Sequence, residues 1–106
     1  MANYVLIYTG GAMAVTPAEQ EAQMKSWGTW FTKLGANVVD PGNPFVPVVK
    51  HVGQGGKAGD GAVGTQASGY SIIKSDSLAA AVESAKECPI VQGGGQISVY
   101  EVMPVM

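Results

Sequence analysis

The sequence contains no arginine, one histidine and one cysteine among its 106 residues. Because all six basic residues are lysines, the chain has no guanidinium group for bidentate binding of phosphate or carboxylate. The single cysteine, Cys88, excludes a disulfide within the chain and is typical of a reducing compartment. One histidine and one cysteine, without HxH or CxxC spacing, form no cluster of metal ligands. We therefore expect neither a metal nor a cofactor.

Charge and long apolar runs are also scarce. Charged residues make up 13% of the chain, about half the usual share of roughly 25%. A net charge of −2 and a pI near 5.1 argue against nucleic acid or an anionic membrane as partners. No run approaches the ~18 apolar residues of a transmembrane helix, and the first residues lack the basic region of a signal peptide. The expected location is the cytoplasm.

The length suits one domain, residues 1–106, and is too short for two domains with separate cores. An apolar share of 46% indicates a packed globular fold. The many glycines of residues 53–69 predict a mobile loop or a loose hairpin. In the extended segment before them, residues 45–52, Pro47 cannot donate a ladder hydrogen bond and favours an edge strand or a bulge. Runs of β-branched and aromatic residues between turn residues predict strands at residues 3–9, 37–40, 45–52, 69–75 and 96–102.

A first helix is predicted over residues 17–34. Thr16 can cap it, Pro17 suits its first position, and Glu19 occupies the capping-box position. Gly35 is well placed for a left-handed C-terminal cap. Trp30 flanks a stripe of apolar residues at helical spacing, which consists of Met24, Trp27, Phe31 and Leu34. This stripe is the predicted buried face.

A second helix is predicted after Asp76 or Ser77, either of which can cap it, and Pro89 should end it near Cys88. With no histidine nearby in the sequence, Cys88 is interpreted as a small buried residue rather than a nucleophile. The apolar stripe of this helix consists of Leu78, Ala81, Val82 and Ala85.

The order of these elements predicts an α+β fold of the ferredoxin-like, split βαβ type with an antiparallel sheet. Two helices can cover only one face of such a sheet. The first strand is nevertheless apolar on both sides, with Val5 and Ile7 alternating with Leu6 and Tyr8. A face left to water should alternate to polar residues. We therefore expect a homodimer in which a second copy covers the other face.

Motifs spread in order over nearly the whole chain support this fold. They lie at residues 4–9, 34–35, 39–44, 60–61, 69–70, 75–78, 88–89 and 99–104. In order and spacing they resemble the YCII-related (DGPF) family. The resemblance implies a dimeric α+β barrel, in which two ferredoxin-like sheets face each other. The tetrapeptide that names the family lacks its proline and phenylalanine here and reads Asp60-Gly61-Ala62-Val63.

The resemblance leaves the activity open. Some members of the wider family are suspected of hydrolytic or dehalogenating chemistry through a histidine on the first helix that works with an aspartate. When the chains are aligned on Gly35, that position holds Met24. A methionine cannot transfer a proton, so this catalytic role does not carry over.

His51 and Asp40 are the one conceivable acid–base pair of the sequence. An imidazole beside a carboxylate can shuttle a proton near neutral pH, and the two residues lie on neighbouring extended segments. The alternative is that Asp40 caps the turn at Pro41-Gly42, with His51 at an exposed strand end.

Tyrosines could line a ligand pocket or a dimer interface, in which tyrosine is enriched. The predicted pocket combines Tyr8 and Tyr70 with His51 and Asp40. The predicted function is a non-catalytic small-molecule-binding or accessory homodimer. The alternative is a cofactor-independent enzyme, a lyase, hydrolase or monooxygenase, that uses His51 and Asp40.

Overall fold

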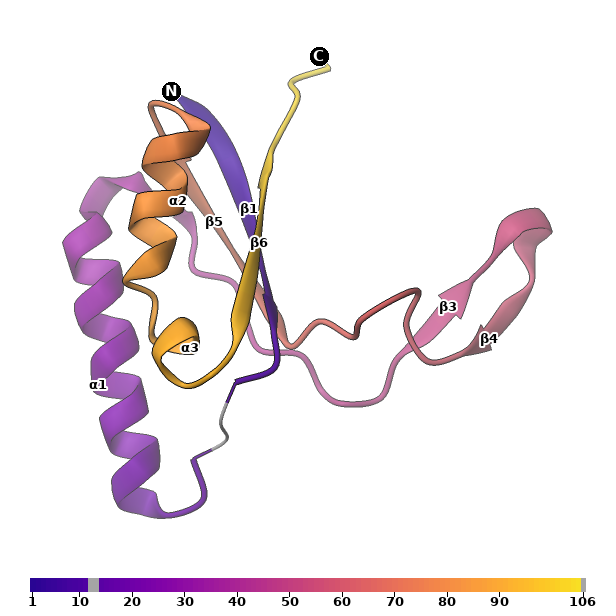
Figure 1. The fold of residues 1–106 in the computed structure, drawn as a ribbon, viewed down its shortest axis with the longest axis horizontal. Helices are drawn as coiled ribbons and strands as arrows, with labels where there is room; N and C mark the ends of the chain where they lie inside the picture. The colour runs from indigo at the N-terminus through magenta and orange to yellow at the C-terminus, as the bar shows by residue number, and fades with distance from the viewer. Residues whose placement is uncertain (12–13, 106) are drawn as a thin grey trace.

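The computed structural model describes residues 1–11 and 14–105 and shows a small α+β domain with an antiparallel sheet (Figure 1). The α+β class predicted from the sequence is confirmed. The elements in chain order are β1 (Ala2–Thr9), α1 (Pro17–Leu34), the 3-10 turn η1 (Gly35–Asn37), β2 (Val38–Asp40), β3 (Lys50–Val52), the 3-10 turn η2 (Gln54–Gly56), β4 (Ala58–Asp60), β5 (Gly69–Ser75), α2 (Leu78–Lys86), α3 (Pro89–Gln92) and β6 (Gln96–Glu101).

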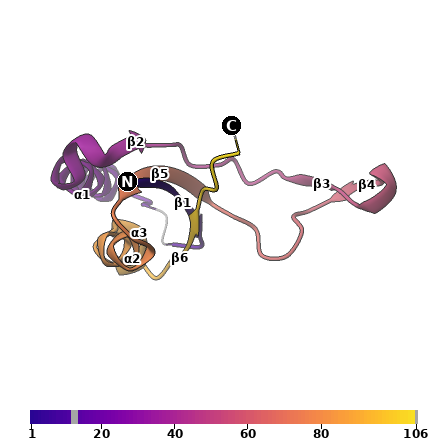
Figure 2. The ribbon, with the colours of Figure 1, turned by 90° about the horizontal axis from the view of Figure 1, so that it is seen from above.

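The main sheet has the strand order β2-β5-β1-β6, and each neighbouring pair is antiparallel. This order is compatible with the split βαβ arrangement expected from the sequence. Strands β1 and β5 lie in the centre, whereas β2 and β6 form the edges. The helices lie together on one side of the sheet (Figure 2). The opposite side is therefore not covered by any helix of the described chain.

The N-terminal ends of α1 and α2 follow the predicted capping chemistry. The Thr16 hydroxyl accepts the backbone N–H of Glu19 at 3.1 Å, and the Glu19 carboxylate in turn accepts the backbone N–H of Val15 at 3.0 Å. Gly35 ends α1 with a φ of 58° and a ψ of −126°, a positive-φ conformation that glycine tolerates best but not the left-handed helical cap expected from the sequence. At α2, Ser77 provides the cap by accepting the backbone N–H of Ala80 at 3.1 Å.

The buried face of α1 differs from the predicted one. Trp30, predicted at the edge of the stripe, is the most buried residue of the helix, with 4% of its surface exposed. Its indole N–H donates to the carbonyl of Ser84 in α2 at 3.0 Å. Met24, predicted to be part of the buried stripe, is 76% exposed. The buried face is thus centred on Trp30, flanked by Trp27, Phe31 and Leu34.

Pro89 has a second role that the sequence did not predict. α2 ends at Lys86, shortly before Pro89, as expected. Pro89 also begins the short helix α3, where its fixed φ and missing N–H suit the first position. The cysteine before it, Cys88, is fully buried in the core.

The two sides of β1 are separated by the strand alternation. Tyr4, Leu6 and Tyr8 face the helices and are buried, together with Ile73 of β5. Val5 and Ile7 point to the other side and are half-buried. We call that other side the open face, and it consists of Val5, Ile7, Tyr70, Ile72 and Tyr100, which the strand register places next to one another.

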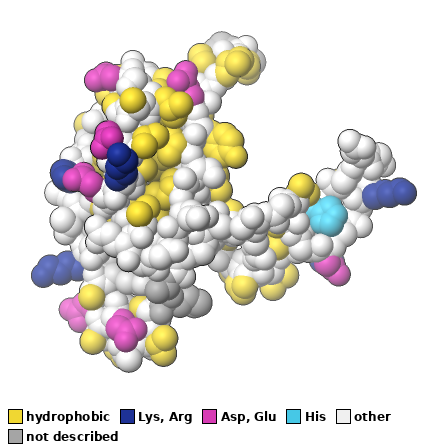
Figure 3. Space-filling model, viewed as in Figure 1, with side chains coloured by type: hydrophobic (Ala, Val, Ile, Leu, Met, Phe, Trp, Pro, Cys, Tyr) yellow, Lys and Arg dark blue, Asp and Glu magenta, His cyan; other side chains and the backbone are white. Residues whose placement is uncertain are grey.

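Residues 45–68, here called the arm, project from the body of the domain (Figures 1 and 3). The arm contains the β3–β4 hairpin, in which His51 lies opposite Gly59. Of the two predictions for residues 53–69, the structure favours the hairpin over the unstructured loop. At the base of the arm, Pro44 forms a bridge with Gly69.

Candidate functional site

The polar group of most interest is Asp40, at the end of β2. One carboxylate oxygen accepts the backbone N–H of Gly42 at 2.8 Å, and the other accepts the hydroxyl of Tyr70 at 3.1 Å. The ring of Phe45 stacks on that of Tyr70, with 5.8 Å between centroids and 24° between planes. We call Asp40, Tyr70 and Phe45 the Asp40 cluster. It places a carboxylate beside two stacked rings.

The turn after β2 holds this carboxylate in place. Gly42 has a φ of +71°, and a Cβ at this position would lie 1.7 Å from the carbonyl oxygen of Tyr70. Only glycine fits there, because the turn packs directly on the backbone of β5. The alternative that Asp40 caps the Pro41-Gly42 turn is thereby confirmed.

The carboxylate also sets the protonation of its tyrosine neighbour. The hydrogen bond to Asp40, together with its negative charge, raises the pKa of the Tyr70 hydroxyl above its ordinary value, since ionisation would place two anions side by side. At neutral pH, Tyr70 is therefore a hydrogen-bond donor. Each oxygen of Asp40 accepts one hydrogen bond from the protein and has a further lone pair for another donor.

Tyr8 lies on the opposite side of the sheet from the Asp40 cluster. In the register of β1 and β5, Tyr70 pairs with Ile7 and Tyr8 pairs with Gly69, so the two tyrosines point to different faces. Tyr8 is buried under α1, with its ring 5.4 Å from that of Trp27 in an edge-on arrangement. The structure does not bring Tyr8 and Tyr70 into one pocket.

Tyr8 is nevertheless linked to the turn that holds Asp40. Its hydroxyl donates to the Ser71 hydroxyl at 2.6 Å, and Ser71 donates to the carbonyl of Pro41 at 2.7 Å. Burial raises the pKa of Tyr8, so this hydroxyl keeps its proton. Ser71 was not singled out from the sequence, although a serine at a core-facing position of an apolar strand needs a partner and is a signal of this kind.

His51 lies away from Asp40 within one chain. It belongs to β3 on the arm, whereas Asp40 ends β2 in the main sheet (Figure 1). The Nδ1 atom of His51 is 3.1 Å from the carbonyl oxygen of Gly61. Its ring covers Gly59, where an added Cβ would lie 2.6 Å from the ring. The contacts of His51 are thus made within the arm, and the acid–base pair with Asp40 is not formed.

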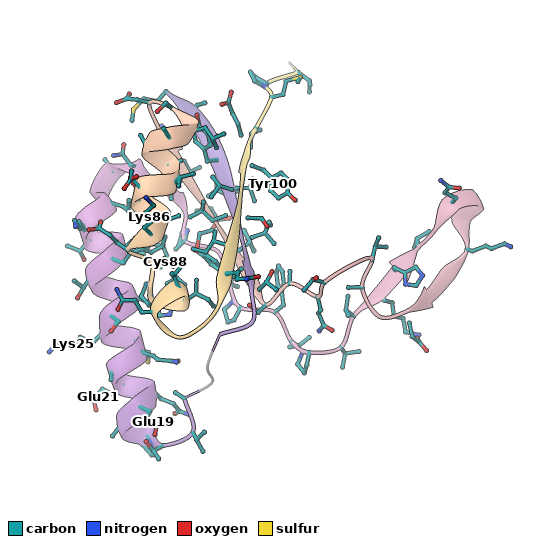
Figure 4. The ribbon with its side chains drawn as sticks, viewed as in Figure 1. Glu19, Glu21, Lys25, Lys86, Cys88 and Tyr100 are labelled. Carbon is teal, nitrogen blue, oxygen red and sulfur yellow. The ribbon has the colours of Figure 1, made fainter. Side chains whose placement is uncertain are left out.

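Cys88 is placed for packing rather than for chemistry. It lies at the junction of α2 and α3 (Figure 4) and is fully buried. Burial raises the pKa of its thiol to about 11, so the nucleophilic thiolate is scarce at neutral pH. No group of three or more histidine, cysteine, aspartate or glutamate residues that could hold a metal ion occurs in residues 1–11 and 14–105.

A second apolar surface lies on the flank of the domain. It is a shallow groove of about 350 Å³ between the C-terminal helices and β6, and apolar side chains gather in this region of the surface (Figure 3). Its lining residues are Leu78, Val82, Ala85, Lys86, Val91, Ile97 and Val99. With one lysine as its only ionisable residue, the groove offers packing and no reactive group.

No protein-family model and no curated protein matches this chain. The resemblance to the YCII-related family therefore stays a prediction. In the part of the chain that the structure describes, no helix has the length and apolar character needed to cross a membrane.

Proposed function

We propose that this protein is a cytoplasmic homodimer that binds a small molecule without catalysis, or serves as an accessory protein, and that its ligand contacts the Asp40 cluster. The observation that carries the proposal is the position of the cluster at the end of the open face. There, a carboxylate fixed by two donors adjoins the stacked rings of Phe45 and Tyr70. Sites of this kind combine apolar contact with a few fixed polar groups.

The chemistry of the cluster selects a class of ligand. The free lone pairs of Asp40 accept hydrogen bonds, and a negative charge favours a cationic or neutral donor. The neighbouring aromatic rings favour a flat, unsaturated body. The chain has no arginine for binding anions. The expected ligand is a small planar molecule that carries an amine, amidine or amide N–H.

The open face supports the homodimer. Val5, Ile7 and Ile72 remain half-buried within one chain, and Tyr100 is 60% exposed. The Tyr100 side chain points away from the helices (Figure 4). Burial of such a face against a second copy is the arrangement that the YCII-related resemblance implies, with two ferredoxin-like sheets forming a dimeric α+β barrel. The ligand would then lie at the end of the interface between the sheets.

The alternative, a cofactor-independent enzyme that uses His51 and Asp40, lacks a supporting contact within one chain. His51 is held on the arm. Met24, at the position of the histidine in the suspected catalytic relatives, lies exposed on α1. The binding protein is therefore the proposal that we retain.

A fragment screen by ¹H–¹⁵N NMR, using planar amines and amidines, tests the proposal. We expect shifts of the amides of Gly42 and Tyr70 on binding. The variant Asp40→Asn keeps the side-chain carbonyl that Gly42 contacts but removes the charge. It should weaken binding by roughly 10-fold or more, the loss of one hydrogen bond to a charged group.

The matched control is Asp60→Asn, the same substitution on the exposed carboxylate of β4. It should leave the affinity unchanged. Binding that Asp40→Asn does not weaken, or shifts confined to other parts of the surface, would overturn the proposed site. Turnover of a bound compound that persists in His51→Gln would overturn binding without catalysis and would exclude His51 from the reaction. Turnover lost with binding intact would favour the enzyme alternative that uses His51 and Asp40.

A further inference from the structure

The arm carries several valine side chains that are exposed in the described part of the chain. Four of its valines are between 72% and 79% exposed, namely Val46, Val48, Val52 and Val63. Single exposed apolar residues are common on protein surfaces. Four on one projecting segment of 24 residues, in a chain with little charge, form an unusual apolar surface.

The arm is held by hydrogen bonds at its base and along its length. At its base, the backbone N–H of Phe45 donates to the carbonyl of Ser68 at 2.9 Å, and that of Ser68 donates to the carbonyl of Tyr8 at 2.7 Å. Further out, the Gln66 side chain donates to the carbonyl of Pro47 at 2.8 Å. The Ser68 bond fastens the arm to β1, and the other two bonds tie the two sides of the arm together.

With its arm, the chain is more extended and has a larger accessible surface than a compact monomer of its length. The radius of gyration is 15.2 Å, whereas a compact chain of this length has about 13 Å. The accessible surface is 7417 Å², which exceeds by roughly 1,800 Å² the area typical of a folded monomer of this mass.

We infer that the arm of each copy clasps the body of a second copy, which occupies the angle between the arm and the open face. This inference rests on the homodimer of the proposed function and adds the part of the chain that holds it together. Helices cover one side of the sheet and the arm extends from the other side (Figure 2). The open face and the arm therefore border the same space (Figure 3).

A second copy fits this space better than another class of partner. Two-fold symmetry places the arm of each chain on the body of the other, so the same apolar surfaces are covered twice. Burial of the excess area on both chains would total about 3,600 Å², within the range of obligate dimers. The arm carries only Lys50, Lys57 and Asp60 as charged residues, too little net charge for a nucleic acid or a membrane surface.

An intermolecular relaxation experiment tests the clasp directly. A nitroxide is attached to Val52→Cys in unlabelled protein, which is refolded together with ¹⁵N-labelled wild-type chain. The native Cys88 is buried and protonated, so it should not take up the label. We expect broadening of amide signals in the body of the ¹⁵N-labelled chain. A nitroxide at Gln20→Cys, on the exposed part of α1, should not broaden the amides of β1 and β5.

A second measurement uses matched valine variants. Val48→Ser with Val52→Ser should raise the dissociation constant of the dimer on the order of 10⁴-fold, as expected for the loss of four buried valines, two on each arm of the two-fold dimer. Val15→Ser, on an equally exposed valine of the body, should leave it unchanged. All three side chains are exposed in one chain, so the variants should fold.

The outcomes separate the clasp from the proposed function. A dimer with an unchanged dissociation constant in the arm variant, or with broadening confined to the partner's arm, overturns the clasp and leaves the proposed function standing. A monomer at millimolar concentration overturns both the clasp and the homodimer. The ligand assay with Asp40→Asn tests binding at the Asp40 cluster, whatever the outcome of these two experiments.

Discussion

The hydrogen-bonded chain Tyr8–Ser71–Pro41 predicts a strongly non-additive pair of substitutions. Tyr8→Phe removes one buried neutral hydrogen bond, and Ser71 still donates to Pro41. Its cost should be about 1 kcal/mol. Ser71→Ala is more damaging, because it leaves the buried Tyr8 hydroxyl and the Pro41 carbonyl without this partner. Its cost should be about 1–3 kcal/mol. The Cys88 thiol, which also interacts with Tyr8, is too weak an acceptor to replace serine.

The double variant should be no less stable than Ser71→Ala alone, since phenylalanine leaves no hydroxyl to satisfy. The coupling energy should therefore be at least about 1 kcal/mol. Urea unfolding at pH 7 and one fixed protein concentration measures all four free energies, because the stability of a dimer depends on concentration. Additive costs would show that the two hydroxyls do not act on each other as the structure indicates. A loss of about 1 kcal/mol should also lower the melting temperature by roughly 4–8 °C.

Three further predictions concern α1, the Asp40 cluster and the core. Trp30→Ala should cost about 3–5 kcal/mol, more than Phe31→Ala in the same urea series. Asp40→Asn should lower the pKa of Tyr70 toward 10.0 in a ¹³C NMR titration of the tyrosine rings. Because this pKa is raised in the folded state, the contribution of Tyr70 to stability is complete below pH 10.0 and is lost as the pH rises through the folded pKa. Cys88 should react with a thiol reagent at pH 8 only as fast as the protein unfolds, and a rapid reaction of the native protein would contradict its buried, protonated state.

Local chemistry made much of the fold predictable. The caps at Thr16 and Ser77 and the positive φ of Gly35 depend on neighbouring residues, and all three are seen. The buried face of α1 was predicted less well. Helical spacing allows two buried faces for α1. One consists of residues 27, 30, 31 and 34, and the other of residues 24, 27, 31 and 34. The choice between them depends on where α2 supplies the Ser84 carbonyl to Trp30, and a single sequence does not reveal this contact.

The candidate site was predictable only where it depends on neighbouring residues in the sequence. Asp40 and its turn follow from the Pro-Gly sequence, and Tyr70 follows from the pairing of β2 with β5. Tyr8 and Tyr70 were grouped because both are strand tyrosines, but the face on which each lies depends on the strand register. His51 is near Asp40 in sequence, yet it lies on the projecting hairpin between β2 and β5, whereas Asp40 ends β2 in the main sheet.

The free edge of β6 has a consequence for handling the protein. The strand lies at the end of the sheet, so its outer row of backbone N–H and C=O groups faces no strand of the described chain. Natural edge strands are often protected by lysine, proline or a bulge, but β6 has the sequence QISVYE with one terminal charge. Edge-to-edge growth into β-rich aggregates is the expected failure of this protein on storage. It should be fastest near the pI of about 5.1, where net charge no longer keeps the molecules apart.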